Sequence, residues 1–98
     1  MYTIKSTPEF ASWLLSLRDK PTKKRLQTRL RKVQLGNLGD VKPVGGGVFE
    51  MREFFGAGWR MYYIQRGNVL IIMLGGGDKS TQSADIAKAI KLATTIED

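Results

Sequence analysis

The stretch that decides the fold is VFEMREFFGAGWRMYYIQRGNVLIIMLGGGDK, which occupies residues 48–79. Two turn signals divide it, Gly56-Ala57-Gly58 and Gly67-Asn68, because glycine adopts turn conformations that are strained for residues with a Cβ. The strands predicted on this basis span residues 48–55, 59–66 and 69–74. The third is apolar throughout, which predicts a central strand covered on both faces. We expect the glycine triplet at residues 75–77 to end the sheet.

One cation accompanies each predicted strand: Arg52 in the first, Arg60 in the second and Lys79 just beyond the third. If the strands are neighbours, these three side chains converge on one surface. Three cations held on rigid strands form a plausible site for an anion, and phosphate is the commonest biological anion. Spacing alone favours the alternative that they are ordinary exposed charges on the hydrated face of the sheet.

Neither cysteine nor histidine occurs in the 98 residues. The chain therefore has no disulfide, no thiolate zinc site and no cysteine nucleophile, and it lacks the side chain that most often titrates near neutral pH. Because the carboxylates are few and scattered, we expect no metal site and no cofactor. No apolar run is long enough to span a membrane and no signal peptide is visible, so we expect a cytoplasmic protein without a membrane partner.

The net charge of +7 is concentrated in residues 18–32, which hold eight Lys or Arg residues and one acid, Asp19. Such a patch attracts a polyanion, which is a nucleic acid, a ribosome or an acidic protein. The alternative is a solvated helix face with no partner. The residues predicted to bind RNA or the ribosome are Lys20, Lys23, Lys24, Arg25, Arg31 and Lys32.

Two helices are predicted before the sheet, after a short strand at residues 2–5. The first begins near Pro8 and carries an apolar stripe at helical spacing. The second spans about residues 22–35, because Pro21 marks a break and Gly36 suits a C-terminal cap. Their short connection predicts an antiparallel helical hairpin.

The remaining elements complete a single α+β domain over residues 1–98. Residues 37–47 form a loop with a possible short strand at residues 40–44, and a last helix begins after Ser80 or Thr81. The predicted fold has the N-terminal strand and the helical hairpin packed on a small, mainly antiparallel sheet, with a C-terminal helix.

Four motifs follow one another at the sheet and beyond it: Phe49-Glu50-Met51-Arg52, GAGWRMYY at 56–63, LGGGDKSTQ at 74–82, and Asp85-Ile86. With these residues in this order, the chain resembles the RelE/ParE superfamily of bacterial toxins. Within it, the chain is most similar to the HigB-like branch, often called addiction-module killer proteins. The resemblance covers nearly the whole chain and implies a RelE-like fold.

The resemblance also implies a function. The protein is expected to be the toxin of a type II toxin–antitoxin system, an endoribonuclease (mRNA interferase) that cleaves messenger RNA on the ribosome and so inhibits translation. Its expected partners are the mRNA, the ribosome and a cognate antitoxin. The antitoxin of HigB-like proteins is commonly a helix-turn-helix protein, HigA-like, which also represses the shared promoter.

The resemblance assigns roles to individual residues. Arg60 matches the arginine that contacts the scissile phosphate, Lys79 the basic residue after the last strand, and Arg52 the arginine of the preceding motif. The chain departs from RelE where Glu50 replaces a lysine and where Asp85 falls near the position of a tyrosine. The histidines of some HigB toxins are absent. Glu50 is then the candidate general base, and attack of a 2′-hydroxyl on the adjacent phosphorus requires no metal.

Two other functions remain open. A ParE-like protein would inhibit DNA gyrase without catalysis, and it shares the fold, so the fold cannot separate it from a nuclease. A binding module for RNA or the ribosome would depend on the basic helix alone. Such a module would be disabled by charge reversal at Lys24 and Arg31, whereas Arg60→Ala would have little effect.

Overall fold

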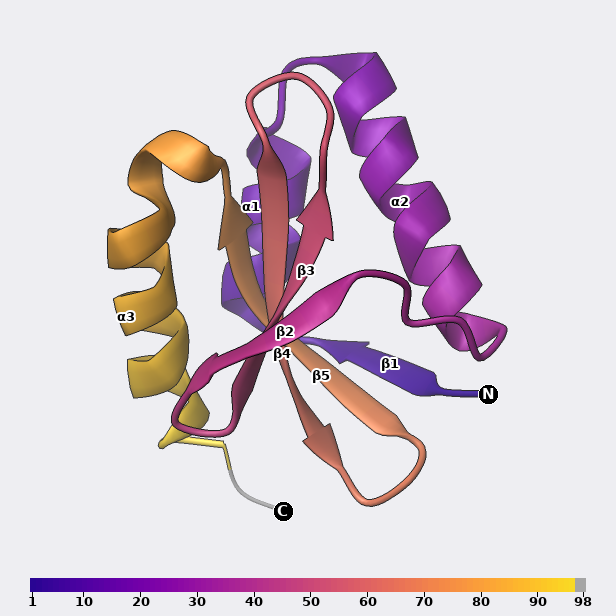
Figure 1. Cartoon of the computed structure of the whole chain (residues 1–98), viewed down its shortest axis with the longest axis vertical. Coiled ribbons are helices and arrows are strands. Elements are labelled where there is room, and N and C mark those ends of the chain that lie inside the picture. Colours follow the sequence, from indigo (N-terminus) through magenta and orange to yellow (C-terminus); the bar gives the residue numbers. More distant parts are fainter. Residues whose placement is uncertain (97–98) are drawn as a thin grey trace.

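The computed structural model describes residues 1–96, which fold around one five-stranded sheet flanked by three helices (Figure 1). The elements in chain order are β1 (Thr3–Ser6), α1 (Pro8–Ser16), α2 (Lys20–Gln34), β2 (Val41–Gly45), β3 (Val48–Glu53), β4 (Trp59–Arg66), β5 (Leu70–Gly77), a 3-10 turn (Lys79–Thr81) and α3 (Gln82–Ala93). This is the predicted α+β order, and the short strand that was possible at residues 40–44 is present as β2.

The sheet has the strand order β1-β5-β4-β3-β2. The strands β2 to β5 pair antiparallel with their neighbours in sequence, and β1 pairs parallel with β5. The prediction of a mainly antiparallel sheet is therefore confirmed. The apolar strand β5 lies inside the sheet, as its uninterrupted run of aliphatic residues indicated.

The sheet separates two hydrophobic clusters. The side chains of α1 and α2 pack on one face together with Met51 and Met61, whereas Ala89 and Ala93 of α3 pack on the other face with Tyr62. Figure 1 shows α2 and α3 on opposite sides of the strands. Alternate residues of β3 and β4 therefore serve opposite cores, which is the period of two expected for strands.

Side-chain caps fix where α1 and α2 begin. The Thr7 hydroxyl accepts a hydrogen bond from the Phe10 amide at 3.1 Å, and Pro8 occupies the first turn as predicted. The start predicted for α2 was wrong by two residues. Asp19 caps it by accepting from the Thr22 amide at 3.1 Å, and Pro21 is tolerated in the first turn, where its missing N–H leaves no bond unmade.

The glycine triplet does not end the sheet, contrary to the prediction. β5 continues through Gly77, which lies opposite Arg60 of β4. Gly76 and Gly77 are required by packing from opposite sides: a Cβ on Gly76 would overlap the Trp13 ring, and a Cβ on Gly77 would overlap the Asp85 carboxylate. The triplet is therefore the place where helices from both layers approach the strand backbone.

None of the helices within residues 1–96 has the length and apolar character required to cross a membrane.

Candidate active site

Four polar side chains from two adjacent strands share the α3 side of the sheet. Glu50 lies directly opposite Tyr62, and Arg52 lies directly opposite Arg60. Residues opposite each other in an antiparallel pair point to the same face, and so do residues two positions apart. Tyr62 packs against the α3 cluster, so all four side chains belong to that face.

A buried ion pair lies at the centre of this group. Glu50 has 0% of its surface exposed and Arg60 has 8%. The Arg60 Nε atom is 3.6 Å from Glu50 Oε2, and Arg60 Nη1 donates to the Gly58 carbonyl at 2.7 Å. The Gln82 side-chain amide, from the first turn of α3, donates to the same Glu50 oxygen at 2.9 Å. The carboxylate is therefore held from the sheet and from the helix together.

Four buried polar atoms at this place make no hydrogen bond within residues 1–96: Glu50 Oε1, Arg52 Nε, Arg60 Nε and the Tyr62 hydroxyl. Buried polar groups in folded proteins are nearly always hydrogen-bonded, because leaving one unpaired is costly. Burial raises the pKa of Tyr62 above its ordinary value, and the nearby Glu50 carboxylate raises that pKa further. Arg60 Nε is still ion-paired with Glu50, and the Tyr62 hydroxyl lies close to the same carboxylate, so the unused hydrogen-bonding capacity belongs mainly to Glu50 Oε1 and Arg52 Nε.

Lys79 joins Arg60 at the edge of this cluster. Its backbone N–H donates to the Ala57 carbonyl at 3.3 Å, which ties the turn after β5 to the loop between β3 and β4. Gly58 separates the two cations: an added Cβ there would lie 3.2 Å from Arg60 Nη1 and 3.4 Å from Lys79 Cβ. Lys79 is exposed, whereas Arg60 is almost covered.

The structure brings two of the three predicted cations together and holds the third apart. Arg52 shares the face of Arg60, but its guanidinium donates to Asp40 Oδ1 at 2.9 Å. This hydrogen bond raises the pKa of Arg52 above its ordinary value. Asp85, which was placed near the position of a family tyrosine, accepts a hydrogen bond from the Thr81 hydroxyl.

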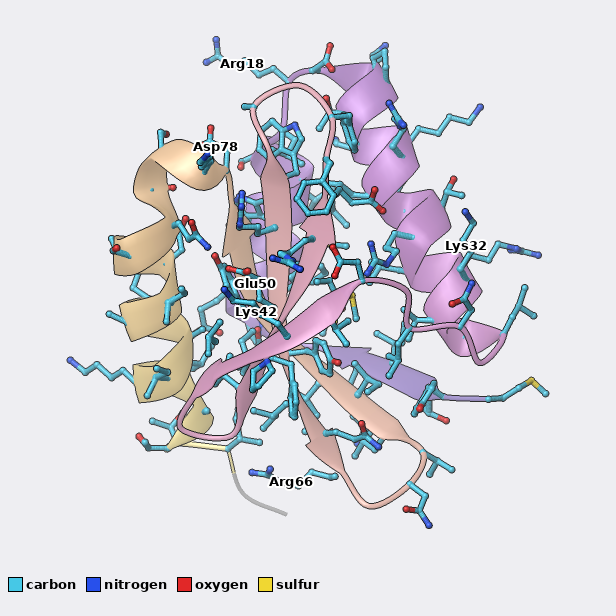
Figure 2. The ribbon with its side chains drawn as sticks, in the orientation of Figure 1. Arg18, Lys32, Lys42, Glu50, Arg66 and Asp78 are labelled. Atoms are coloured by element: carbon cyan, nitrogen blue, oxygen red, sulfur yellow. The ribbon has the colours of Figure 1, made fainter. Side chains whose placement is uncertain are left out.

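Two contributors to the cluster, Tyr62 and Gln82, were not predicted, and neither was the exposed neighbour Lys42. Tyr62 belonged to the quoted motif at residues 56–63, but no role was assigned to it. Gln82 belonged to a quoted motif, but only the folded chain brings it to Glu50. Lys42 pairs in register with Glu50, and Figure 2 shows the two labelled residues together on the α3 side of the sheet. The missing information is sheet register for Tyr62 and Lys42, and the packing of α3 on the sheet for Gln82.

The predicted RNA-binding residues lie on the other side of the sheet from Glu50, on or at the start of α2 (Figure 2). Lys20, Lys24, Arg25, Arg31 and Lys32 are exposed, and Lys23 is half-buried with its Nζ 3.4 Å from the Leu15 carbonyl. The basic helix and the buried ion pair are therefore two separate surfaces.

Arg29 is the exception within the basic segment, because it is buried. Its guanidinium donates to the carbonyls of Leu38, Asp40 and Arg52 and pairs with Glu53 at 3.0 Å. It anchors the loop after α2 to the end of β3. Arg29 was counted in the basic patch from its place in the sequence, but in the structure it stabilises the fold and is not available to a polyanion.

Comparison with known proteins places the chain in a family. No protein-family model and no solved structure matches it. A Haemophilus influenzae protein described as "Uncharacterized protein" is 46% identical over 90 residues, which is 92% of this chain and 91% of that protein. The chain belongs to the same family as this Haemophilus influenzae protein. Since any 90-residue span of a 98-residue chain includes residues 9–90, the strands that carry the cluster lie within the matched length. The relative's description states no activity for the family.

Proposed function

We propose that this protein is the toxin of a type II toxin–antitoxin pair and that it cleaves messenger RNA without a metal. The observation that supports this best is the buried Glu50–Arg60 ion pair, surrounded by buried polar atoms that make no hydrogen bond within residues 1–96, next to the exposed Lys79. A sheet needs no ion pair on a face that is otherwise packed, and buried ion pairs contribute little net stability. Such a cluster suits a phosphate-transfer site.

The chemistry assigned to the cluster is transesterification. The 2′-hydroxyl gives its proton to a base, for which Glu50 is the candidate, and attacks the adjacent phosphorus in line, while the bond to the 5′-oxygen breaks and that oxygen takes a proton from an acid, for which Lys79 is the candidate. Arg60 and Lys79 stabilise the negative charge that develops on the phosphate oxygens, because a preorganised cation near the reacting group is worth more than one in water. Lys79 lies nearer to solvent and is the candidate that protonates the leaving oxygen. Arg52 contributes to phosphate binding once it exchanges Asp40 for the substrate.

Glu50 keeps its assignment as the candidate general base. In the described conformation its carboxylate contacts Arg60 and Gln82 and has no exposed surface. A base must come within hydrogen-bonding reach of the proton that it removes. We therefore propose that Glu50 first positions the Arg60 guanidinium, and that it acts as a base only if the bound message opens the cluster.

The proposal extends to the partners. The exposed cations of α2 attract the phosphates of a message or of ribosomal RNA. Messages and ribosomes are cytoplasmic, so this is the proposed place of action. Uncontrolled cleavage of messages would stop growth, so the proposal includes a cognate antitoxin, which the HigB-like resemblance implies is a helix-turn-helix protein.

The test adds the purified protein, without antitoxin, to a reconstituted bacterial translation mixture and maps the 5′ ends of a defined message by primer extension. Naked message serves as the control. New ends that appear only during translation support a ribosome-dependent nuclease. An intact message with normal protein synthesis would reject it, and inhibition of DNA supercoiling by gyrase would then be measured, because that is the activity of the ParE-like alternative.

One comparison separates the nuclease from the binding module in the same mixture. The paired charge reversal Lys24→Glu/Arg31→Glu is set beside Arg60→Ala. A nuclease loses cleavage in the Arg60 variant. A binding module that depends on α2 alone would retain its effect on translation in that variant and lose it in the charge-reversed one.

A further inference from the structure

The loop between β3 and β4 carries the most exposed aromatic ring in the described part of the chain. Phe54 is 73% exposed, whereas every other aromatic side chain in residues 1–96 is buried or half-buried. Figure 1 shows this loop at one end of the sheet, between α2 and the turn that leads into α3. Phe54 directly follows β3, and its ring belongs to neither hydrophobic cluster.

Two arginines from different surfaces contact the two rings of this loop. The Arg52 Cζ atom lies 5.4 Å from the centre of the Phe54 ring, and the Arg25 Cζ atom lies 4.0 Å from the centre of the Phe55 ring. Arg52 comes from the face that carries Arg60, and Arg25 comes from α2. We name Phe54 and Phe55 the aromatic crest, because they connect the two surfaces.

The basic surface continues beyond Phe55 into a shallow hollow between α2 and the end of β3. Its volume is about 390 Å³. Its lining residues are Pro21, Lys24, Arg25, Thr28, Arg29, Lys32 and Glu53. The acid in this set, Glu53, is already paired with Arg29 at 3.0 Å. The cations left to meet an incoming polyanion are therefore Lys24, Arg25 and Lys32.

We propose that the aromatic crest is a platform for single-stranded RNA. One base stacks on Phe54, the phosphates on one side contact the cations of α2, and the phosphates on the other side reach Arg52 and Arg60. This inference rests on the proposed function and adds to it the conformation of the substrate. A base that stacks on a ring must be free of its own strand partners, so the crest selects unpaired RNA.

The alternation of charge and ring favours RNA over an acidic protein. Nucleic acid presents a phosphate at every nucleotide with a flat base between, and proteins that bind single strands combine basic grooves with stacking aromatic rings. An acidic segment of a protein would satisfy the cations but would leave Phe54 without a stacking partner. Competition by such a segment is one outcome that the test separates.

The test measures binding of a labelled single-stranded RNA of about 12 nucleotides at low salt by fluorescence anisotropy. Phe54→Leu removes the ring and keeps an apolar side chain, whereas Phe54→Tyr keeps a ring. We expect Phe54→Leu to weaken binding by about fivefold or more, and Phe54→Tyr to bind like the wild type. Val69→Ala is the matched control, because Val69 is 56% exposed in the other hairpin turn. Phe54 is exposed, so thermal unfolding should be unchanged in all variants.

A second probe isolates stacking. With an RNA of the same length that carries abasic riboses, the wild type and Phe54→Leu should bind equally. The proposal that the aromatic crest stacks on RNA would be overturned by unequal binding of the two proteins to this probe, or by their equal binding to the intact RNA. The proposal would also be overturned if Phe54→Leu weakened only the binding of an acidic polypeptide used as a competitor and left RNA binding unchanged.

This readout needs no cleavage. If RNA binding depends on Phe54 but the protein cuts no message, the proposed RNA platform is supported and the proposed nuclease activity is rejected. Cleavage with unchanged binding in Phe54→Leu would do the reverse.

Discussion

At the scale of single residues, burial separates charges that the sequence cannot rank. Arg29 and Arg25 belong to the same basic run, yet Arg29 is buried with four partners and Arg25 is exposed over an aromatic ring. The difference follows from the position of each residue on α2, because one helix face meets the loop at Leu38. A helical wheel places Arg29 beside Leu26 and Val33, which are buried residues of α2, so helical spacing alone would have indicated that Arg29 is buried.

Tyr62 provides a prediction about stability at alkaline pH. Its pKa is raised by burial, so the folded protein keeps the phenol proton at pH values where the unfolded chain releases it, above about 10. Below that pH both states are protonated and Tyr62 adds no pH dependence. Above it the unfolded state gains stability, and unfolding becomes easier as the pH rises.

Ionisation of Tyr62 in the unfolded chain should lower the free energy of unfolding by roughly 1 kcal/mol at pH 11, and this contribution should be absent in Tyr62→Phe. Urea unfolding of both proteins at pH 8 and pH 11 measures it. Tyr63→Phe is the comparison, since burial also raises the pKa of Tyr63. An equal alkaline loss in the wild type and in Tyr62→Phe would contradict the assignment.

Glu50 provides a prediction about catalysis. Glu50→Gln keeps the shape of the side chain but removes the charge beneath Arg60. If Glu50 positions Arg60, the cleavage rate should fall by about tenfold while its dependence on pH keeps its shape. The pH–rate profile in the translation assay measures both. Loss of the limb that reports the general base would show instead that Glu50 accepts the proton.

At the scale of elements, the sequence predicted the strands and turns well and the glycine triplet wrongly. Apolar runs between turn glycines define β4 and β5, and these signals are local. The reason for Gly76 is not local, because it is the ring of Trp13 on another element. In a sequence, consecutive glycines predict the end of a strand. Only the folded structure shows that helices packed against this strand leave no room for a larger residue at Gly76.

Gly76→Ala should therefore destabilise the protein by about 1–3 kcal/mol, because the new methyl group overlaps the Trp13 ring. Gly75→Ala is the matched control: an added Cβ at Gly75 meets nothing within 4 Å, so its effect should be small. Chemical denaturation of the three proteins gives the difference. Equal stabilities of the two variants would show that Trp13 can move aside.

At the scale of the whole molecule, two features of the sequence become two separate surfaces. The basic run forms the outside of α2, whereas the two strand cations, Arg52 and Arg60, lie on the α3 side of the sheet, and Lys79 follows β5 next to Gly58. The sequence predicted that both exist, but not that the sheet lies between them. That separation depends on strand order and on which face each helix covers, and neither can be read from charge patterning.

The separation also bears on the proposed RNA path. In that proposal, the RNA touches both surfaces by crossing the end of the sheet at Phe54 and Phe55, the rings that Arg52 and Arg25 contact. A flexible single strand can follow that path, whereas a rigid duplex bends only at a cost. The proposed RNA path therefore runs from α2 across the loop between β3 and β4 and ends at Arg60 and Lys79.

The most direct measurement is the rate at which single-site variants cleave a translating message under single-turnover conditions. Arg60→Ala and Lys79→Ala should each lower the rate by about 10²–10³-fold, as expected when a group that stabilises developing charge is removed. Lys88→Ala, an exposed lysine on α3, should cut at the wild-type rate. Lys79 is exposed, so its loss should leave the unfolding temperature unchanged. Wild-type cleavage by folded Arg60→Ala and Lys79→Ala proteins would contradict the assignment of the active site.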